Sequence, residues 1–177
     1  MLLLVLGSLG CGPPWRVIRA SGPPSALHGM TSLAVVFDYS ALMMGGMFEA
    51  QWLATQPPDE QASYLAVRTS MEEHFLLELA AQLGRDGIAV RRATGAESHQ
   101  VVVRPTRIEM GFYRFMVTMD STLDARLVYG TGGAETDEID VHLTRAASLR
   151  NASIAERMDW CASRAAQLAA DYVRQAR

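Results

Sequence analysis

The chain has 177 residues, of which 49% are hydrophobic, and this is enough for one domain with a well-filled core. The formal net charge is −3, which gives no electrostatic footprint of a nucleic-acid-binding protein. All 16 basic residues are arginine, which is typical of a GC-rich genome and is no sign of arginine-specific chemistry.

The first ten residues carry no charged side chain and lead directly to Cys11. This pattern resembles the lipobox of bacterial lipoproteins, in which signal peptidase cuts before the cysteine and the thiol then carries the lipid. The apolar stretch is shorter than the ~20 residues that span a bilayer, and it fits the h-region of a signal peptide. We therefore predict a signal peptide over residues 1–10 and lipidation of Cys11. Ser8 stands where most lipoboxes have Leu, Val or Ile, so the alternative is a soluble protein with an apolar N-terminus.

Residues 11–30 contain two Pro-Pro pairs and three glycines that interrupt any helix. Proline favours extended backbone, so this composition predicts a flexible tether that lets the domain stand off a membrane surface. Ordered structure is expected to begin near Thr31, which makes residues 31–177 a single domain. Residues 33–37 form a short β-rich apolar run, typical of a central strand that is buried on both faces.

Residues 41–56 allow two interpretations. Gly45-Gly46 lies within a run of methionines and aromatic residues, and a flexible Met-rich surface is a common binding site. The alternative is a loop that covers one end of the core. The candidate ligand or partner surface consists of five residues, namely Met43, Met44, Met47, Phe48 and Trp52.

A long helix follows Pro57-Pro58, with Asp59 as the expected N-cap and Gly84 and Gly87 at its end. Its apolar residues recur at spacings of three and four, which defines one buried face. The members of that face are Tyr64, Val67, Met71, Phe75, Leu79 and Leu83.

Four strands are expected next. The first is short, at 88–90, and the second runs from Gln100 to Arg104 or on to Met110, with Pro105 at an edge or a bulge. The third alternates apolar and polar residues from Phe115 to Tyr129, and the fourth does so around Ile139, Val141 and Leu143. The glycine-rich turn at 130–133 joins the last two into an antiparallel hairpin. Their polar outer face is either solvated or a partner surface.

The C-terminal helix begins with a complete capping box, Ser153 to Glu156. Its buried stripe consists of Ile154, Met158, Cys161, Ala165, Leu168 and Tyr172. The element order β-α-β-β-β-β-α predicts an α+β two-layer sandwich, with two helices packed on one face of a mostly antiparallel sheet.

Motifs that would carry chemistry are weak. His142 shares a strand face with Asp140 and Glu138, a trio able to hold a cation, although a solvated polar face explains it better. Cys161 has no neighbouring histidine to activate it, and a small buried residue is its simplest interpretation, with an intermolecular disulfide as the alternative. The turn at 130–133 precedes a strand rather than a helix, so it offers no helix N-terminus to a phosphate. We therefore expect no catalytic residues, no metal and no cofactor.

The order of Cys11, a proline-rich segment, a strand, a long helix, a strand meander and an Ala-rich helix resembles small bacterial envelope lipoproteins. Residues 108–113, the long strand and Asp137-Glu138-Ile139 look like a group of uncharacterised lipoproteins typical of GC-rich deltaproteobacteria such as myxobacteria. Two better-known groups share the layout. They are the auxiliary lipoproteins of ABC-type lipid transport systems, whose final helix is similar to residues 162–173, and the lipopolysaccharide-assembly lipoprotein.

The resemblance implies no catalytic residues. Gly12 stands where many lipoproteins retained in the inner membrane have aspartate, so it implies an outer-membrane protein that faces the periplasm. The leading hypothesis is a non-catalytic, lipid-anchored domain that binds or helps to assemble another envelope component. The second is an accessory role in lipid or lipopolysaccharide transport, which needs an apolar groove. The third, an enzyme, would need carboxylates and His142 gathered in a pocket.

Overall fold

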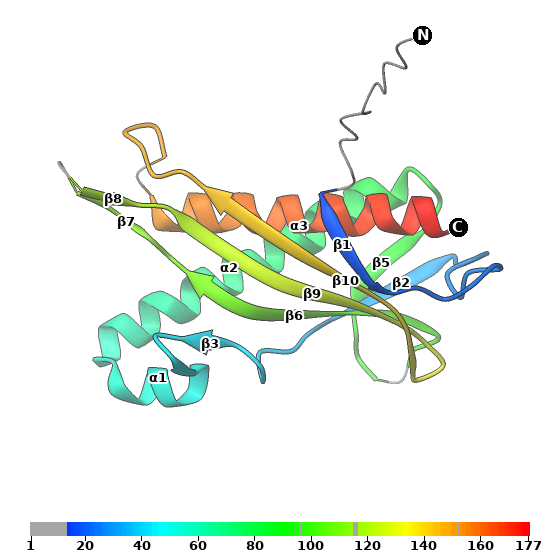
Figure 1. Ribbon diagram of the computed structural model, residues 1–177, viewed down its shortest axis with the longest axis horizontal. Helices are drawn as coiled ribbons and strands as arrows, with labels where there is room; N and C mark the ends of the chain where they lie inside the picture. Colours follow the sequence, from blue (N-terminus) through cyan, green and yellow to red (C-terminus); the bar gives the residue numbers. More distant parts are fainter. Residues whose placement is uncertain (1–13, 96, 115–116, 152) are drawn as a thin grey trace, which may run out of the picture.

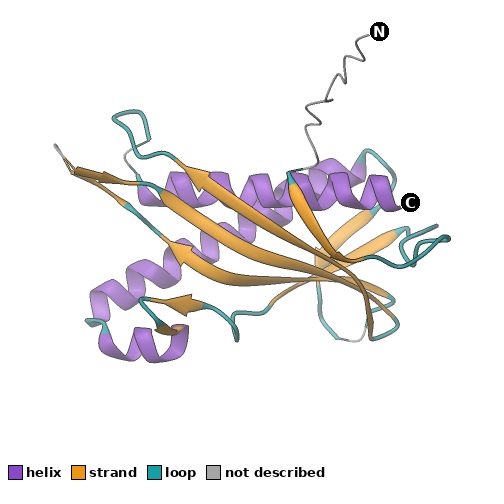
Figure 2. Ribbon diagram, viewed as in Figure 1, coloured by secondary structure: helices purple, strands orange, loops and turns teal. Residues whose placement is uncertain are grey.

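The structure is a computed structural model that describes residues 14–95, 97–114, 117–151 and 153–177. Within these ranges eight strands form one sheet, a further hairpin extends from it, and helices pack on one side (Figures 1 and 2). The elements in chain order are β1 Trp15–Arg19, β2 Ser32–Phe37, β3 Met43–Met44, β4 Met47–Phe48, α1 Glu49–Thr55, α2 Pro58–Gly84, β5 Ala89–Arg92, β6 His99–Glu109, β7 Phe112–Arg114, β8 Val117–Met119, β9 Ser121–Thr131, β10 Ala134–Arg145 and α3 Ile154–Ala176. The predicted α+β fold, with a mostly antiparallel sheet and the helices on one face, is confirmed.

The sheet has the order β1-β10-β9-β6-β2-β5, with β3 and β4 attached beside β6. The pairs β1–β10, β10–β9 and β9–β6 are antiparallel, whereas β2 is parallel to both β6 and β5. Leu33, Ala34 and Val35 of β2 are buried, as expected for a strand between two others. The register of β6 shifts between Pro105 and Arg107, so Pro105 lies at a bulge in an interior strand and not at an edge.

The two long helices bury the faces that their sequence periodicity predicts. Tyr64, Met71, Phe75, Leu79 and Leu83 of α2 are buried, and so is the Ala-rich stripe of α3. The Ser153 hydroxyl accepts a hydrogen bond from the Glu156 backbone N–H, which confirms the predicted N-cap of α3. The predicted Asp59 cap is wrong. The N-cap of α2 is Pro57, and Asp59 lies in the first turn, where its charge favours the helix dipole.

Part of the predicted tether is folded. Trp15–Arg19 forms β1, which pairs with residues 138–141 of β10, and Leu27 and Met30 are completely or almost completely buried. The prediction of a flexible segment up to residue 30 is therefore wrong for this part, because the partner of β1 lies more than a hundred residues further along the chain. Prolines and glycines signal irregular backbone, but they carry no information about pairing at that distance.

The long third strand is interrupted. β8 ends at Met119 and β9 begins at Ser121, with Asp120 between them. Met119 is 43% exposed, so it does not belong to the buried row, whereas Leu123, Ala125 and Leu127 are buried as predicted. β7 and β8 instead form a separate two-stranded hairpin. Phe115, which was expected at the start of the long strand, lies outside the described residues.

Candidate functional site

The Met-rich segment forms a hairpin followed by a short helix. β3 pairs with β4 through Met43↔Phe48 and Met44↔Met47, and β3 touches β6 at Met43↔Arg107. Gly45 and Gly46 have φ values of 57° and 84°, which only glycine adopts without strain in a two-residue turn. Residues 41–56 thus form an ordered hairpin and a short helix, and the buried Met44 covers part of the core, in agreement with the alternative of a segment that covers one end of the core.

The five candidate residues differ in exposure. Phe48 is 52% exposed and Met43 is 37% exposed, whereas Met44 is buried at 5%. Met47 and Trp52 are half-buried, and the Trp52 ring meets Tyr64 edge-on with centroids 5.2 Å apart. We use the name Met-rich surface for Met43, Met47, Phe48 and Trp52. Met44 belongs to the core beneath it.

A buried carboxylate fixes the Met-rich surface to α2. Glu49, at the start of α1, is 8% exposed and accepts a hydrogen bond from the Tyr64 hydroxyl. The Arg68 guanidinium donates to both Glu49 oxygens, at 3.0 and 3.2 Å. Burial, followed by the contact with Glu49, raises the pKa of Tyr64, which therefore remains a donor at neutral pH. The hairpin and α1 thus present their apolar residues from a rigid base.

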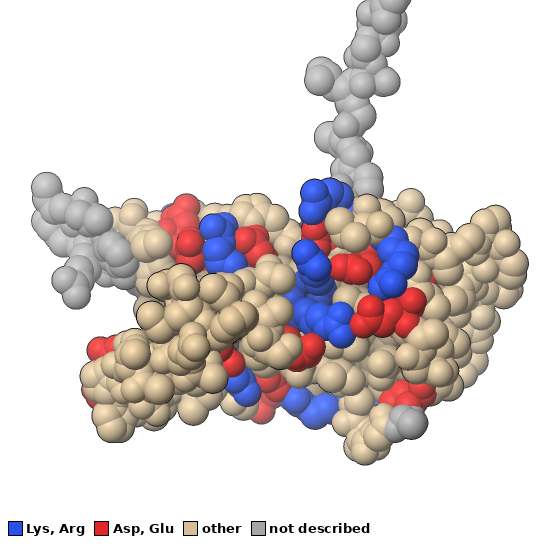
Figure 3. All heavy atoms as spheres, turned by 60° about the horizontal axis from the view of Figure 1, so that its bottom comes forward, with Lys and Arg blue, Asp and Glu red and all other residues tan. Residues whose placement is uncertain are grey.

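The open face of the sheet carries alternating charges, which Figure 3 shows as intermixed blue and red spheres near the centre of the view. Arg16 binds Asp140 at 2.5 Å, and Arg104 binds Glu135 at 2.9 Å. Hydrogen bonds from Arg19 and Arg104 hold the pKa of Glu135 below its ordinary value. This ion-pair lattice occupies the face that the sequence predicts to be polar.

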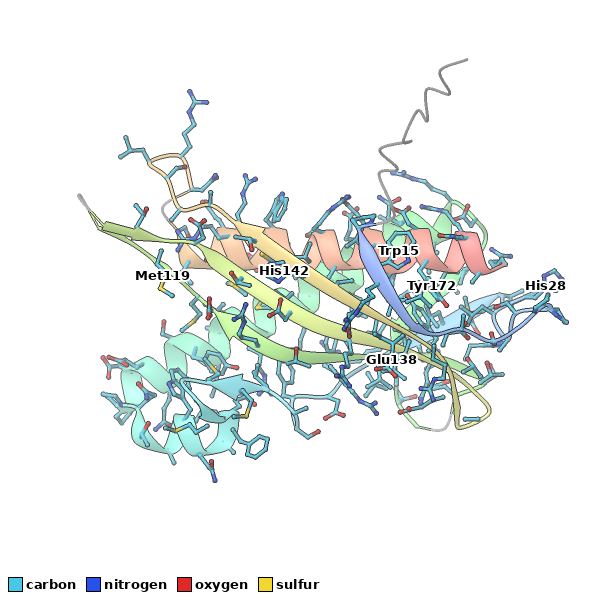
Figure 4. All side chains as sticks on the ribbon, viewed as in Figure 1. Trp15, His28, Met119, Glu138, His142 and Tyr172 are labelled. Carbon is cyan, nitrogen blue, oxygen red and sulfur yellow. The ribbon has the colours of Figure 1, made fainter. Side chains whose placement is uncertain are left out.

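The predicted trio of Glu138, Asp140 and His142 does share this face, but each member is paired with a side chain of the neighbouring strand β9. Asp140 and Glu138 both lie near Arg126 of β9, at 3.5 and 3.6 Å, and His142 binds Asp124. Figure 4 shows Glu138 and His142 well separated along β10. In the described part of the chain, no three His, Cys, Asp or Glu side chains are grouped to hold a metal ion.

A shallow groove of about 460 Å³ lies on the charged face beside the start of β1. Its lining includes Trp15, Arg16, Asp124, Arg126, Asp140 and His142. The contribution of β1 to this groove was missed by sequence reasoning, because Arg16 was assigned to a tether. The β-rich run Trp15-Arg16-Val17-Ile18-Arg19 is the signal that would have identified it.

The two cysteines are the remaining residues that the sequence analysis singles out. Cys161 is buried between α3 and the sheet, and burial raises the pKa of its thiol to about 11, so the thiol is protonated and poorly nucleophilic. Cys11 lies outside the described residues. Among the helices of the described residues, none has the length and hydrophobicity needed to span a bilayer.

The sequence matches no model of a known protein family and no curated protein. Solved structures with a similar arrangement include PelC from Paraburkholderia phytofirmans, crystallised as a dodecamer, with 15% identity and a TM-score of 0.45 over 84% of this chain and 96% of that chain. Protein XCC0632 from Xanthomonas campestris, of the DUF330 family, has 9% identity and a TM-score of 0.44 over 89% and 90% of the two chains. A minor lipoprotein from Acinetobacter baumannii has 8% identity and a TM-score of 0.35 over 80% and 94%.

Proposed function

We propose that this protein is a non-catalytic envelope lipoprotein, anchored through Cys11, whose domain binds another envelope protein through the Met-rich surface. The observation that carries the proposal is the exposure of Met43 and Phe48 on a base fixed by buried Glu49. Exposed apolar side chains on a rigid frame favour association, because the partner buries them without first ordering the surface.

The start of β1, which is the described strand nearest to Cys11 in the chain, and the Met-rich surface lie at opposite sides of the molecule. The start of β1 is at the top of Figure 1, whereas α1 and β3 are at the lower left. A lipid on Cys11 would therefore leave the Met-rich surface facing away from the membrane. Gly12, which stands in place of an inner-membrane retention aspartate, supports an outer-membrane location on the periplasmic side.

A role in lipid or lipopolysaccharide transport is less well supported. Carriage of an acyl chain needs an apolar cavity, and ligand pockets typically measure about 300–1,000 Å³. The apolar cavity between α2, α3 and the sheet, lined in part by Phe37, Met71 and Phe75, measures about 20 Å³. It has room for about one water molecule. We therefore propose the binding role and not the transport role.

The anchor is tested by mass spectrometry of the full chain expressed in a Gram-negative host. The expected result is cleavage before Cys11 and a diacylglyceryl adduct on its thiol, with outer-membrane fractionation. Cys11→Ser should release the protein from the membrane fraction. An unmodified Cys11 in a membrane-free protein would contradict the anchor.

The binding surface is tested by in vivo photo-crosslinking, with a photoreactive amino acid placed at Phe48 and, in a separate chain, at Leu77. Leu77 is a matched control because it is an exposed apolar residue, at 69%, on α2. We expect one discrete envelope adduct from position 48 and none from position 77. The adduct should disappear when Met43→Glu is added. Adducts of equal yield from both positions would rule out the Met-rich surface as the binding site.

A further inference from the structure

The domain begins very close to the predicted anchor. Trp15, the first residue of β1, is four positions after Cys11. An extended chain spans at most about 3.3–3.6 Å per residue, so the Cα atoms of these two residues lie within about 14 Å of each other. If Cys11 carries a lipid, as proposed above, the domain has no long tether and must lie against the membrane.

The pairing of β1 identifies the part of the domain that lies near the anchor. Trp15 pairs with Val141, and β10 then continues to Arg145 before the loop that leads to α3. The four residue steps from Val141 to Arg145 cover about 13 Å of strand. The end of β10 therefore lies about as far from Trp15 as the largest possible distance between Trp15 and Cys11. Figures 1 and 2 show the start of β1 and this loop on the same side of the molecule, away from α1.

The side chains at this end are suited to a bilayer surface. Leu149, in the loop, is 85% exposed, the highest exposed fraction among the large hydrophobic side chains exposed in the described part of the chain. Trp160 of α3 is 38% exposed, and the Arg145 guanidinium lies over its ring at 4.8 Å. Tryptophan prefers the lipid–water interface, and arginine binds the phosphates of anionic headgroups.

Hydrogen bonds hold the loop in this position. The Ala147 backbone N–H donates to Asp120 at 3.0 Å, and the buried Arg157 donates to the Asn151 carbonyl oxygen at 2.7 Å. The exposure of Leu149 is therefore maintained by an ordered loop. Transfer of this exposed apolar side chain from water into an apolar phase would be favourable.

Arg150 follows Leu149 in the loop and is exposed. We propose that Arg145, Leu149, Arg150 and Trp160 form a membrane edge, which rests on an anionic phospholipid bilayer beside the lipid on Cys11. Leu149 and Trp160 enter the interface, and the two arginines bind lipid phosphates. This proposal depends on the proposed anchor, and it adds an orientation. The membrane edge faces the bilayer, and the Met-rich surface faces the periplasm.

The test uses the full chain, with the lipid on Cys11 verified by mass, in vesicles of phosphatidylethanolamine and phosphatidylglycerol. Half of the samples contain lipids with brominated acyl chains, which quench tryptophan fluorescence at short range. We expect quenching in the unmodified chain, and Trp160→Phe should lower it, while the remaining quenching comes from Trp15 near the anchor. Trp52→Phe is the matched control, because Trp52 belongs to the Met-rich surface, and it should leave the quenching unchanged.

A second pair of variants leaves all three tryptophans in place. Leu149→Glu should lower the quenching strongly, because it places a carboxylate against anionic lipid, whereas Leu77→Glu should leave it unchanged. Quenching that is unaffected by both Trp160→Phe and Leu149→Glu would overturn the membrane edge, and loss of quenching in Trp52→Phe would reverse the orientation. Failure of the anchor is recognised separately, by the absence of lipid mass on Cys11.

Discussion

At the scale of single residues, the contacts of Glu49 with α2 hold the Met-rich surface in place. Its carboxylate is taken out of water and compensated by the Tyr64 hydroxyl and the Arg68 guanidinium. A buried donor that loses its acceptor costs the free energy of its own desolvation. The sequence gives no indication of this arrangement, because Glu49 is one acidic residue among many and its partners come from another helix.

Glu49→Ala should therefore reduce the free energy of unfolding by about 1–3 kcal/mol, since it leaves Tyr64 and Arg68 without their acceptor. Urea unfolding monitored by fluorescence measures this loss. Glu73→Ala, at an exposed position on α2, is the control and should change stability by less than about 0.5 kcal/mol. Equal effects of the two substitutions would show that the buried contact is unimportant.

Asp137 is a second residue whose role depends on its contacts. It is 1% exposed and accepts hydrogen bonds from the Ser21 N–H, the Ser21 hydroxyl and the Tyr172 hydroxyl. Burial alone would raise the pKa of Asp137, but the hydrogen bonds outweigh it and hold the pKa below its ordinary value. The ionised carboxylate thus joins the N-terminal segment to the end of α3.

A lowered folded-state pKa means that ionised Asp137 stabilises the protein above the ordinary pKa of about 4, and that this stability is lost as the pH falls through the folded-state value. Asp137→Asn should be less stable than the unmodified protein at pH 7, and the difference should shrink as the pH falls below the ordinary pKa of about 4 and through the lowered folded-state pKa. Urea unfolding of both proteins at a series of pH values between 7 and this acidic range measures the difference in their free energies of unfolding. A difference independent of pH would mean that the charge contributes nothing.

At the scale of elements, β1 is the strand that extends the folded domain back towards Cys11. β1 is an edge strand, and its residues Val17 and Ile18 are exposed. The Trp15 ring packs edge-on against Tyr172 of α3, with ring centroids 6.3 Å apart, and so attaches β1 to the helix layer (Figure 4). Local periodicity identifies α2, α3, β9 and β10 because each has a continuous apolar face. β1 has five residues and charged positions, so its β-rich composition is a weak signal, and its pairing with β10 establishes the strand.

Trp15→Ala should release β1 from the sheet. Replacement of a fully buried tryptophan by alanine lowers the free energy of unfolding by about 3–5 kcal/mol. We expect a smaller decrease here, because Trp15 is only half-buried. Hydrogen exchange should increase in the β10 peptide that contains residues 138–141. Arg16→Ala is the control, because the Arg16 side chain is 75% exposed and its ion pair with Asp140 is worth about 0–1 kcal/mol. Unchanged exchange in β10 would contradict this role of Trp15.

At the scale of the whole molecule, the helix layer and the sheet share one core, and Cys161 lies within it. The residue is 0% exposed, and its burial raises the pKa of the thiol to about 11. A reagent can reach such a thiol only when α3 leaves the sheet, which separates the two layers. Cys161 therefore reports on the integrity of the entire fold.

Cys161 should not react with a disulfide reagent at pH 8 in the native protein, and it should react completely in denaturant. The reaction rate at intermediate urea concentrations should follow the unfolded fraction measured by circular dichroism. Cys11→Ser keeps the measurement specific to Cys161, since these are the two cysteines of the chain. Rapid reaction under native conditions would show that the layers open locally.

The sequence by itself determined the α+β class, the faces of α2 and α3 and the β9–β10 hairpin, because each depends on spacing within one segment. The tertiary structure decided the remainder. It placed β1 against β10, buried Glu49 under the Met-rich surface and paired the trio around His142 with side chains of β9. These features depend on contacts between segments that are distant in the chain, and periodicity contains no information about such pairs. The structure therefore turns much of a supposed tether into folded chain that begins, within the described residues, with β1 at Trp15.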